Sequence, residues 1–300
     1  MNAASSTKTH DPHFKVDYWS AESILRHPDF PHARRAYFDK VLALYGDDPF
    51  LNKLLMEAVR IVVFAVAICM EAGYRPNDRD TWPTIGNLKK ALALFGLASP
   101  RRIEQIVGRL VQTDFLESRV SPLDRRARLL IPTARMLTHD QDWLIAHYAP
   151  LAVLFGESDY ALPLKGDKAF QRAQRQVATG IFVQSAMVLL RNPDILLFLV
   201  HDAGIFVLIE LAREALNRET PTADLSLAQL GRRFAVSRTH VRQLLSAAEE
   251  RELVKIDQVR RQITLRPRLL TSLDRFIAEG MSNHDLTGAA AKRQLEPGKT

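Results

Sequence analysis

Two short segments combine an apolar stripe with polar side chains that can hydrogen-bond to bases or phosphates. In SRTHVRQLL, residues 237–245, Val241, Leu244 and Leu245 recur at a helical spacing and predict one buried face. The remaining side chains then point outward, where they can donate to acceptors in a groove. The candidate contact residues of this segment are Ser237, Arg238, Thr239, His240, Arg242 and Gln243.

The segment SPRRIEQIV, residues 99–107, repeats this arrangement 138 residues earlier. Its isoleucines and valine are expected to face inward. Arginine matches guanine and glutamine matches adenine in the major groove, each with roughly 1–3 kcal/mol of discrimination. The alternative interpretation is an ordinary solvated helix face in both segments. The candidate contact residues here are Ser99, Arg101, Arg102 and Gln105.

Each candidate helix must begin at a cap for its free N–H groups to face a phosphate. Ser237 and Ser99 are natural N-caps, and Pro100 suits the first helical position. Ser226 opens Ser-Leu-Ala-Gln, a capping box that predicts another short helix just upstream. The positive end of a helix dipole then favours a bound anion.

An arginine-rich hairpin is predicted after each helix. Residues 115–133 and 253–265 both have a short apolar start, a polar middle and a short apolar return. The candidate contact residues at the two hairpin tips are Arg125, Arg126 and Arg128 in the first, and Arg260 and Arg261 in the second.

Positive charge is concentrated in these same regions. The chain has 300 residues and a net charge of +7, while residues 99–128 carry +3 and residues 231–268 carry +6. The rest of the chain therefore sums to about −2. Clusters of this kind favour a polyanionic partner, because phosphate contacts release counterions.

The first hairpin resembles the wing of MarR-type winged helix-turn-helix transcriptional regulators, whose pattern is D-x-R-x-x-x-V-x-L-T. Asp124, Arg126 and Thr133 match this pattern, Leu130 replaces the valine and Pro132 departs from the leucine. The resemblance covers about residues 84–155. It implies a wing arginine in the minor groove and an aspartate, Asp124, that stabilises the wing. The second half resembles winged-helix regulators more loosely, through LGRRFAVSRTHVRQLL.

The order of elements suggests an internal duplication. The offset of 138 falls to 133 after the hairpins, and the long apolar segments 49–72 and 193–215 also correspond. We therefore expect a mostly α-helical fold with two tandem winged helix-turn-helix modules joined through these long apolar helices, which pack together as a pseudo-dimer. The alternative is that one common module occurs twice. The expected divisions are a disordered N-terminus over 1–13, modules over 14–156 and 157–281, and a disordered tail over 282–300.

Motifs for catalysis are not found in the sequence. There is no HExxH, CxxC, glycine-rich phosphate loop or GxSxG, so we expect no enzyme, no cofactor and no metal site. Cys69, the single cysteine, is interpreted as a core thiol and not as a redox sensor, and it suits a cytoplasmic location. His201 and Asp202 interrupt an apolar segment and argue against a membrane span. They form either a hydrogen-bonded polar pair between helices or part of an effector pocket.

These features together predict a sequence-specific transcriptional regulator that binds double-stranded DNA, with or without a small-molecule effector. It would act as a monomeric pseudo-dimer or as a homodimer. Two other functions remain open: a plasmid-type replication initiator with tandem winged helices, and a winged-helix protein-interaction scaffold. The arginine-rich faces favour the DNA-binding alternatives.

Overall fold

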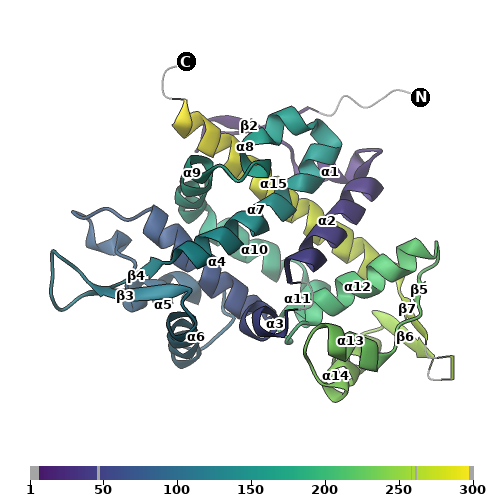
Figure 1. Cartoon of the computed structure of the whole chain (residues 1–300). Helices are drawn as coiled ribbons and strands as arrows, with labels where there is room; N and C mark the ends of the chain where they lie inside the picture. Colours follow the sequence, from purple (N-terminus) through teal and green to yellow (C-terminus); the bar gives the residue numbers. More distant parts are fainter. Residues whose placement is uncertain (1–6, 46–47, 258, 261, 297–300) are drawn as a thin grey trace.

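The computed structural model describes residues 7–45, 48–257, 259–260 and 262–296, and it is mostly helical. Figure 1 shows helices crossing in the centre, with small antiparallel sheets at the periphery. Within the described residues, no single helix is both long and apolar enough to cross a bilayer. The bent pair Lys168–Leu190 and Pro193–Leu199, which meet at 100°, has that length and composition only when taken together.

The first half of the chain ends at Phe155, where Gly156 adopts a positive φ of 94°. Its elements are β1 (Thr9–Asp11), β2 (Val16–Tyr18), α1 (Ala21–Arg26), α2 (Phe30–Tyr45), α3 (Pro49–Leu55), α4 (Ala58–Ala72), η1 (Arg79–Thr81), α5 (Ile85–Ala93), α6 (Pro100–Gln112), β3 (Leu116–Val120), β4 (Arg128–Pro132) and α7 (Ala134–Phe155).

The second half has a similar order. Its elements are η2 (Glu157–Tyr160), α8 (Ala161–Leu164), α9 (Lys168–Ala178), η3 (Thr179–Ile181), α10 (Phe182–Leu190), α11 (Pro193–Leu199), α12 (Gly204–Asn217), β5 (Thr222–Ala223), α13 (Leu227–Arg233), α14 (Arg238–Glu250), β6 (Val254–Asp257), β7 (Gln262–Leu265) and α15 (Pro267–Leu295). The strands pair in the order β5–β7–β6, whereas β3 pairs with β4 alone in its sheet.

The two helix–hairpin segments agree in backbone detail. α6 and α14 each have 13 residues and begin 138 positions apart. After each helix comes a residue in the left-handed region, Asp114 at φ 60° and Glu252 at φ 57°. In both cases the next amide donates to the carbonyl five residues earlier, at 2.9 Å. The same turn therefore leads each helix into its hairpin.

Helices from the two halves interleave in a single hydrophobic core. α2 packs on α7 and also on α12 of the other half, and α9 correspondingly packs on α15 and on α4. The two long apolar segments, which were predicted to pack together, meet at their interruptions. Along most of their length α4 packs on α9, and α12 packs on α2 and on its sequence neighbours α11 and β5.

Both long apolar segments are interrupted, which the sequence pattern did not predict. The first breaks at 56–57, between α3 and α4, and the second at 200–203, between α11 and α12. The breaks meet, because the amide of Ala203 donates to the carbonyl of Met56 at 2.5 Å. Ala203 adopts a positive φ of 56° there. The Ala203 amide thus finds a partner in the other apolar segment, in place of the hydrogen bond that it would make within a continuous helix.

The prediction of disordered ends is wrong for most of the described residues concerned. Residues 282–295 belong to α15, and residues 9–11 form β1; residues 1–6 and 297–300 lie outside the described part. Asp285 accepts from the Trp19 amide at 2.6 Å and from the Tyr160 hydroxyl at 2.8 Å. A Cβ on Gly288 would come within 2.7 Å of the Tyr148 hydroxyl. The small residues near the C-terminus therefore allow close helix packing.

Candidate nucleic-acid interface

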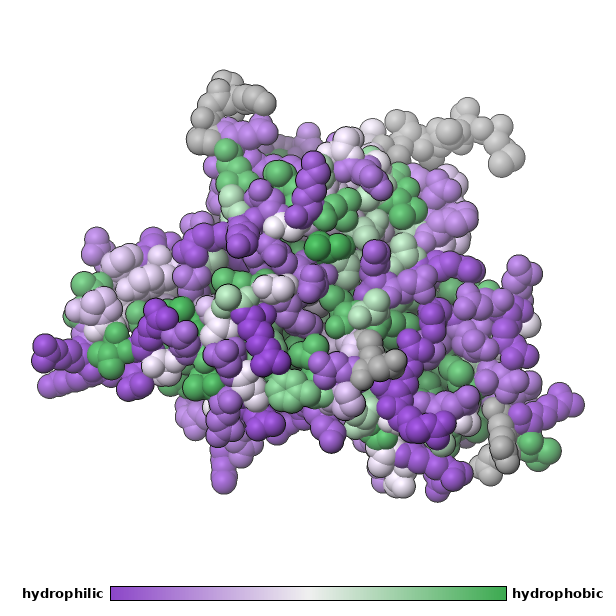
Figure 2. Space-filling model, in the orientation of Figure 1, coloured by the Kyte–Doolittle hydropathy of each residue, from purple (hydrophilic) through white to green (hydrophobic). Residues whose placement is uncertain are grey.

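α6 and α14 lie along the same lower edge of the molecule in Figure 1, and the hairpins β3–β4 and β6–β7 extend toward opposite sides. Figure 2 shows hydrophilic residues at both hairpin ends, interspersed with exposed apolar side chains, which include Val120, Leu123 and Val259. The predicted inward faces of both helices are confirmed. Their buried residues are Ile103, Ile106, Val107 and Leu110 on α6, and Val241, Leu244, Leu245 and Ala248 on α14.

The predicted caps are also confirmed. The Ser99 hydroxyl accepts from the Arg102 amide at 3.3 Å, and the Ser237 hydroxyl accepts from the His240 amide at 3.0 Å. Ser226 forms the full capping box with Gln229 at the start of α13. These local bonds fix where α6, α13 and α14 begin, and so fix which side chains stand on their outer faces.

Most of the candidate contact residues are exposed on these outer faces. Within the described part of the chain, their side chains have no hydrogen-bond or ion-pair partner. They are Arg101 and Gln105 on α6, Arg238, Thr239, Arg242 and Gln243 on α14, and Arg125, Arg126 and Arg260 at the hairpin tips. Their charge and donors are available to an external partner.

Three other candidates are engaged by the protein itself. Arg102 pairs with Glu57 at 2.9 Å, and Arg128 donates to Ser118 at 3.0 and 3.1 Å. His240 was expected to point outward, but its Nε2 donates to the Asp202 carbonyl at 2.8 Å. The ring is thereby directed toward the break at 200–203.

An aspartate holds each hairpin tip. Asp124 Oδ1 accepts from the Arg126 amide at 3.0 Å, and its Oδ2 lies 3.0 Å from the Arg79 guanidinium. Asp257 Oδ1 accepts from the amides of Val259 and Arg260 at 3.0 and 2.9 Å. The role expected for Asp124 thus has a counterpart in Asp257, whose equivalence at an offset of 133 was available from the sequence. Arg261 lies outside the described residues.

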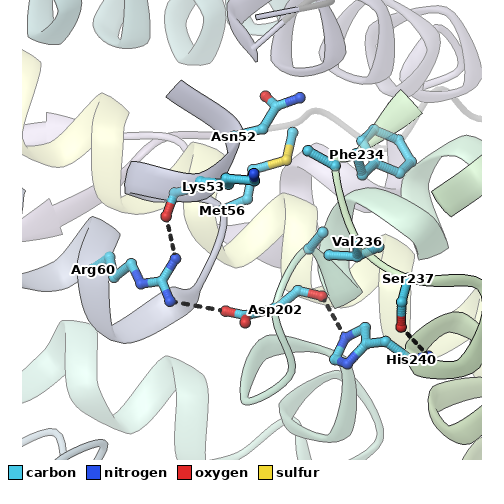
Figure 3. Close-up of a pocket in the computed structure, with 11 residues that line it drawn as sticks. Asn52, Lys53, Met56, Arg60, Asp202, Phe234, Val236, Ser237 and His240 are labelled. Atoms are coloured by element: carbon cyan, nitrogen blue, oxygen red, sulfur yellow. Dashed lines mark hydrogen bonds and ion pairs between the residues drawn. The ribbon is translucent and has the colours of Figure 1, made fainter. Parts of the chain in front are cut away.

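A network of charged groups joins the two helices, and Figure 3 shows its part from Arg60 through Asp202 to His240. Arg60 Nε lies 2.8 Å from Glu57 Oε2, the oxygen that Arg102 also contacts. Arg60 Nη2 lies 3.2 Å from Asp202 Oδ1, and Nη1 donates to the Lys53 carbonyl. The path therefore runs from Arg102 on α6 through Glu57, Arg60 and Asp202 to His240 on α14.

Two adjoining cavities form a groove along this network. One has a volume of about 420 Å³ and is bordered by residues of the two breaks and of the turn before α14. The other, of about 170 Å³, is bordered by Arg102, Gln105 and Arg109. Lys53 and Arg60 line both. Sequence reasoning missed these two residues and Glu57, although the i, i+3 pair Glu57–Arg60 at the edge of an apolar run is a recognisable signal.

His201 and Asp202 lie in the break between α11 and α12, not inside a continuous helix. His201 Nδ1 donates to the Leu197 carbonyl at 2.8 Å, while the Asp202 carboxylate pairs with Arg60. Asp202 lines the 420 Å³ cavity. An effector at this pair stays a prediction.

Cys69 is buried at 2% exposure, and burial raises the pKa of its thiol to about 12. The thiol is therefore protonated at neutral pH, as expected for a core residue.

No family model, curated protein or solved structure matches this chain. The function must accordingly be argued from the arrangement of its own residues.

Proposed function

We propose that this chain is a transcriptional regulator that binds duplex DNA in a sequence-specific manner. In this proposal, α5, α6 and the β3–β4 hairpin form one winged helix-turn-helix module, and α13, α14 and the β5–β7–β6 sheet form the second. The observation that carries the proposal is the set of exposed arginine, glutamine and threonine side chains on the outer faces of α6 and α14, which have no partner within the described part of the chain.

A duplication explains the backbone agreement between the modules. The equal helix lengths, the matching serine caps and the matching left-handed turns all recur at one offset. The reciprocal packing of α2 on α12 and of α9 on α4 supports a pseudo-dimer within one chain. Two reading helices of a pseudo-dimer would be separated by about one DNA turn, roughly 34–36 Å.

The two modules would read related but unequal half-sites. α6 presents Arg101 where α14 presents Thr239, and Glu104 where α14 presents Arg242. Glu104 pairs with Lys89 of α5, which neutralises its charge, whereas Arg242 has no ion-pair partner among the described residues. Arginine and glutamine supply base contacts in the major groove, and the hairpin arginines supply contacts to the minor groove or backbone.

Selection from random duplex DNA at roughly physiological salt tests this proposal, because specific and non-specific binding separate under these conditions. We expect enrichment of a site with two unequal halves, bound by one chain as judged by the mass of the complex. A longer symmetric site bound by two chains would retain the regulator but place the pairing between chains. Failure to enrich any sequence would contradict sequence-specific binding.

A further inference from the structure

A third cavity, of about 250 Å³, lies where helices of the two halves cross. α4, α7, α9, α10 and α15 all contribute to its wall. Most of the lining is apolar, and it includes Ile61 and Val62 of α4, Trp143 of α7, Phe182 of α10 and Phe276 of α15. The cavity is lined by different residues from those that border the groove between α6 and α14.

Two residues that line this cavity each have a buried polar atom without a hydrogen-bond partner among the described residues: Oε1 of Gln174 and Nε2 of His284. Gln174 is only 1% exposed, and its Nε2 donates to the Thr287 hydroxyl at 2.9 Å. This bond fixes the amide and leaves Oε1 as an acceptor. A buried acceptor without a partner is unfavourable, so a donor brought by a ligand would be bound selectively.

Among the described residues that line the cavity, no charged side chain lacks a counter-charge. Arg175 is paired with Asp140 through two contacts, at 2.5 and 3.0 Å. Burial lowers the pKa of His147 to about 4 and also lowers the pKa of His284. Both rings are therefore neutral at pH 7. A charged ligand would lose its hydration without gaining a free counter-charge.

We propose that this cavity binds a neutral aromatic molecule of one ring or two fused rings, whose N–H or O–H group donates to Gln174 Oε1. The size follows from the volume, since a cavity of about 150 Å³ holds benzene. The apolar walls enclose the ring, and Gln174 sets its orientation.

Binding in this cavity would act on the DNA-binding edge through α4, a consequence that rests on the proposed function. Ile61 and Val62 line the cavity, and they directly follow Arg60 in the first turn of α4. A ligand that displaces this turn changes the contacts of Arg60 with Glu57 and Asp202, and with them the relation between α6 and α14.

Isothermal titration of the full chain with indole tests the site. Indole is neutral and carries one N–H, benzofuran has nearly the same shape without it, and indole-3-carboxylate adds a negative charge. We expect indole to bind at least about tenfold more tightly than benzofuran, and the carboxylate to bind more weakly than either. Equal affinities for indole and benzofuran, tighter binding of the carboxylate, or no binding of indole would overturn the proposal.

A variant that fills the cavity locates the site. Ala65 lines the cavity, and Ala65→Phe is expected to abolish indole binding. Circular dichroism and thermal unfolding establish whether the variant folds, and the comparison of ligands on the unaltered chain stands if it does not. Indole binding that persists in folded Ala65→Phe would place the ligand elsewhere. A DNA-binding assay run with and without indole separates the two proposals, since indole can bind a chain that selects no DNA sequence.

Discussion

Arg60 and Asp202 form an ion pair, at 3.2 Å, between residues that lie 142 positions apart in the sequence. Arg60 lies in the first turn of α4, directly after the first break, and Asp202 lies in the second break. Each of the two residues also contacts a partner that connects it to one of the outward-facing helices. On one side Arg60 shares Glu57 with Arg102 of α6, and on the other the Asp202 carbonyl accepts from His240 of α14. The two proposed reading helices are therefore connected through the chain's own side chains.

Removing Arg60 should cost more stability than removing the charge of Asp202. Arg60 is 19% exposed and contacts Glu57, Asp202 and the Lys53 carbonyl, whereas the Asp202 side chain is 49% exposed. We expect Arg60→Met to lower the free energy of unfolding by about 2 kcal/mol or more, and Asp202→Asn by less than about 1 kcal/mol. Urea unfolding measures both. Equal losses would show that the network contributes little beyond the exposed pair.

Arg126 at the first hairpin tip should contribute to DNA affinity without reading a particular base. Arg126→Ala is expected to weaken binding to all sequences and to reduce the slope of log affinity against log salt by about 1. Arg26→Ala is the matched control, because Arg26 is an exposed arginine on α1 with 78% side-chain exposure. Fluorescence anisotropy at several salt concentrations separates the two. The same change in both variants would indicate a general effect of net charge.

Gln243 on α14 should read a base. Gln243→Ala is expected to relax the preference at one base pair by roughly 1–3 kcal/mol, while affinity for non-specific DNA stays close to that of the unaltered chain. Binding to the selected site and to its single-base variants measures this. A uniform loss across all sites would mean that Gln243 contacts the backbone.

Gly288 should not tolerate a side chain, although it lies inside a helix. An added Cβ would approach the buried Tyr148 hydroxyl to 2.7 Å and its ring carbons to 3.0 and 3.2 Å, whereas at Gly280 of the same helix it would meet nothing within 4 Å. We expect Gly288→Ala to lower the free energy of unfolding by about 1–2 kcal/mol and Gly280→Ala to raise it by up to about 1 kcal/mol. A stabilised Gly288→Ala would show that α15 shifts easily away from α7.

Stability should fall between pH 6.5 and pH 4 because of the buried histidines. An ordinary histidine has a pKa near 6.5, while burial lowers the pKa of His147 to about 4. The unfolded chain therefore binds more protons in this window, so acidification favours unfolding. The contribution of His147, on the order of 3 kcal/mol, is complete above pH 6.5 and is lost as the pH falls toward 4.

The lowered pKa of His284 acts in the same direction. His147→Phe keeps a ring stacked on Trp143, 3.6 Å away in the unaltered chain, and should flatten the pH dependence. Urea unfolding at a series of pH values measures this. An unchanged pH profile in the variant would assign the effect to other groups.

The features predicted correctly from the sequence depend on neighbouring residues. Ser99, Ser237 and Ser226 cap helices through bonds to residues three positions further on. The paired strands of both hairpins also follow from short patterns of apolar and turn residues. The inward faces of α6 and α14 follow from helical spacing alone, because a side chain's direction on a helix is set by its position in the sequence.

The features predicted wrongly depend on partners far away in the chain. The composition of residues 282–295 resembles a polar tail, and only Trp19, Tyr148 and Tyr160 give its small and acidic residues a packed environment. His240 was predicted from its sequence position to contact DNA, yet its ring donates to the carbonyl of Asp202.

The sequence by itself therefore determined the helices, their caps, the hairpins and the concentration of positive charge. Only the tertiary structure decided where the apolar segments break, which of the described arginines lack a partner and where a cavity forms between the helices. The reason is physical. Caps and amphipathic faces are set by interactions within a few residues, whereas a break, an ion pair such as Arg60–Asp202 or a cavity depends on groups that meet only after the chain has folded.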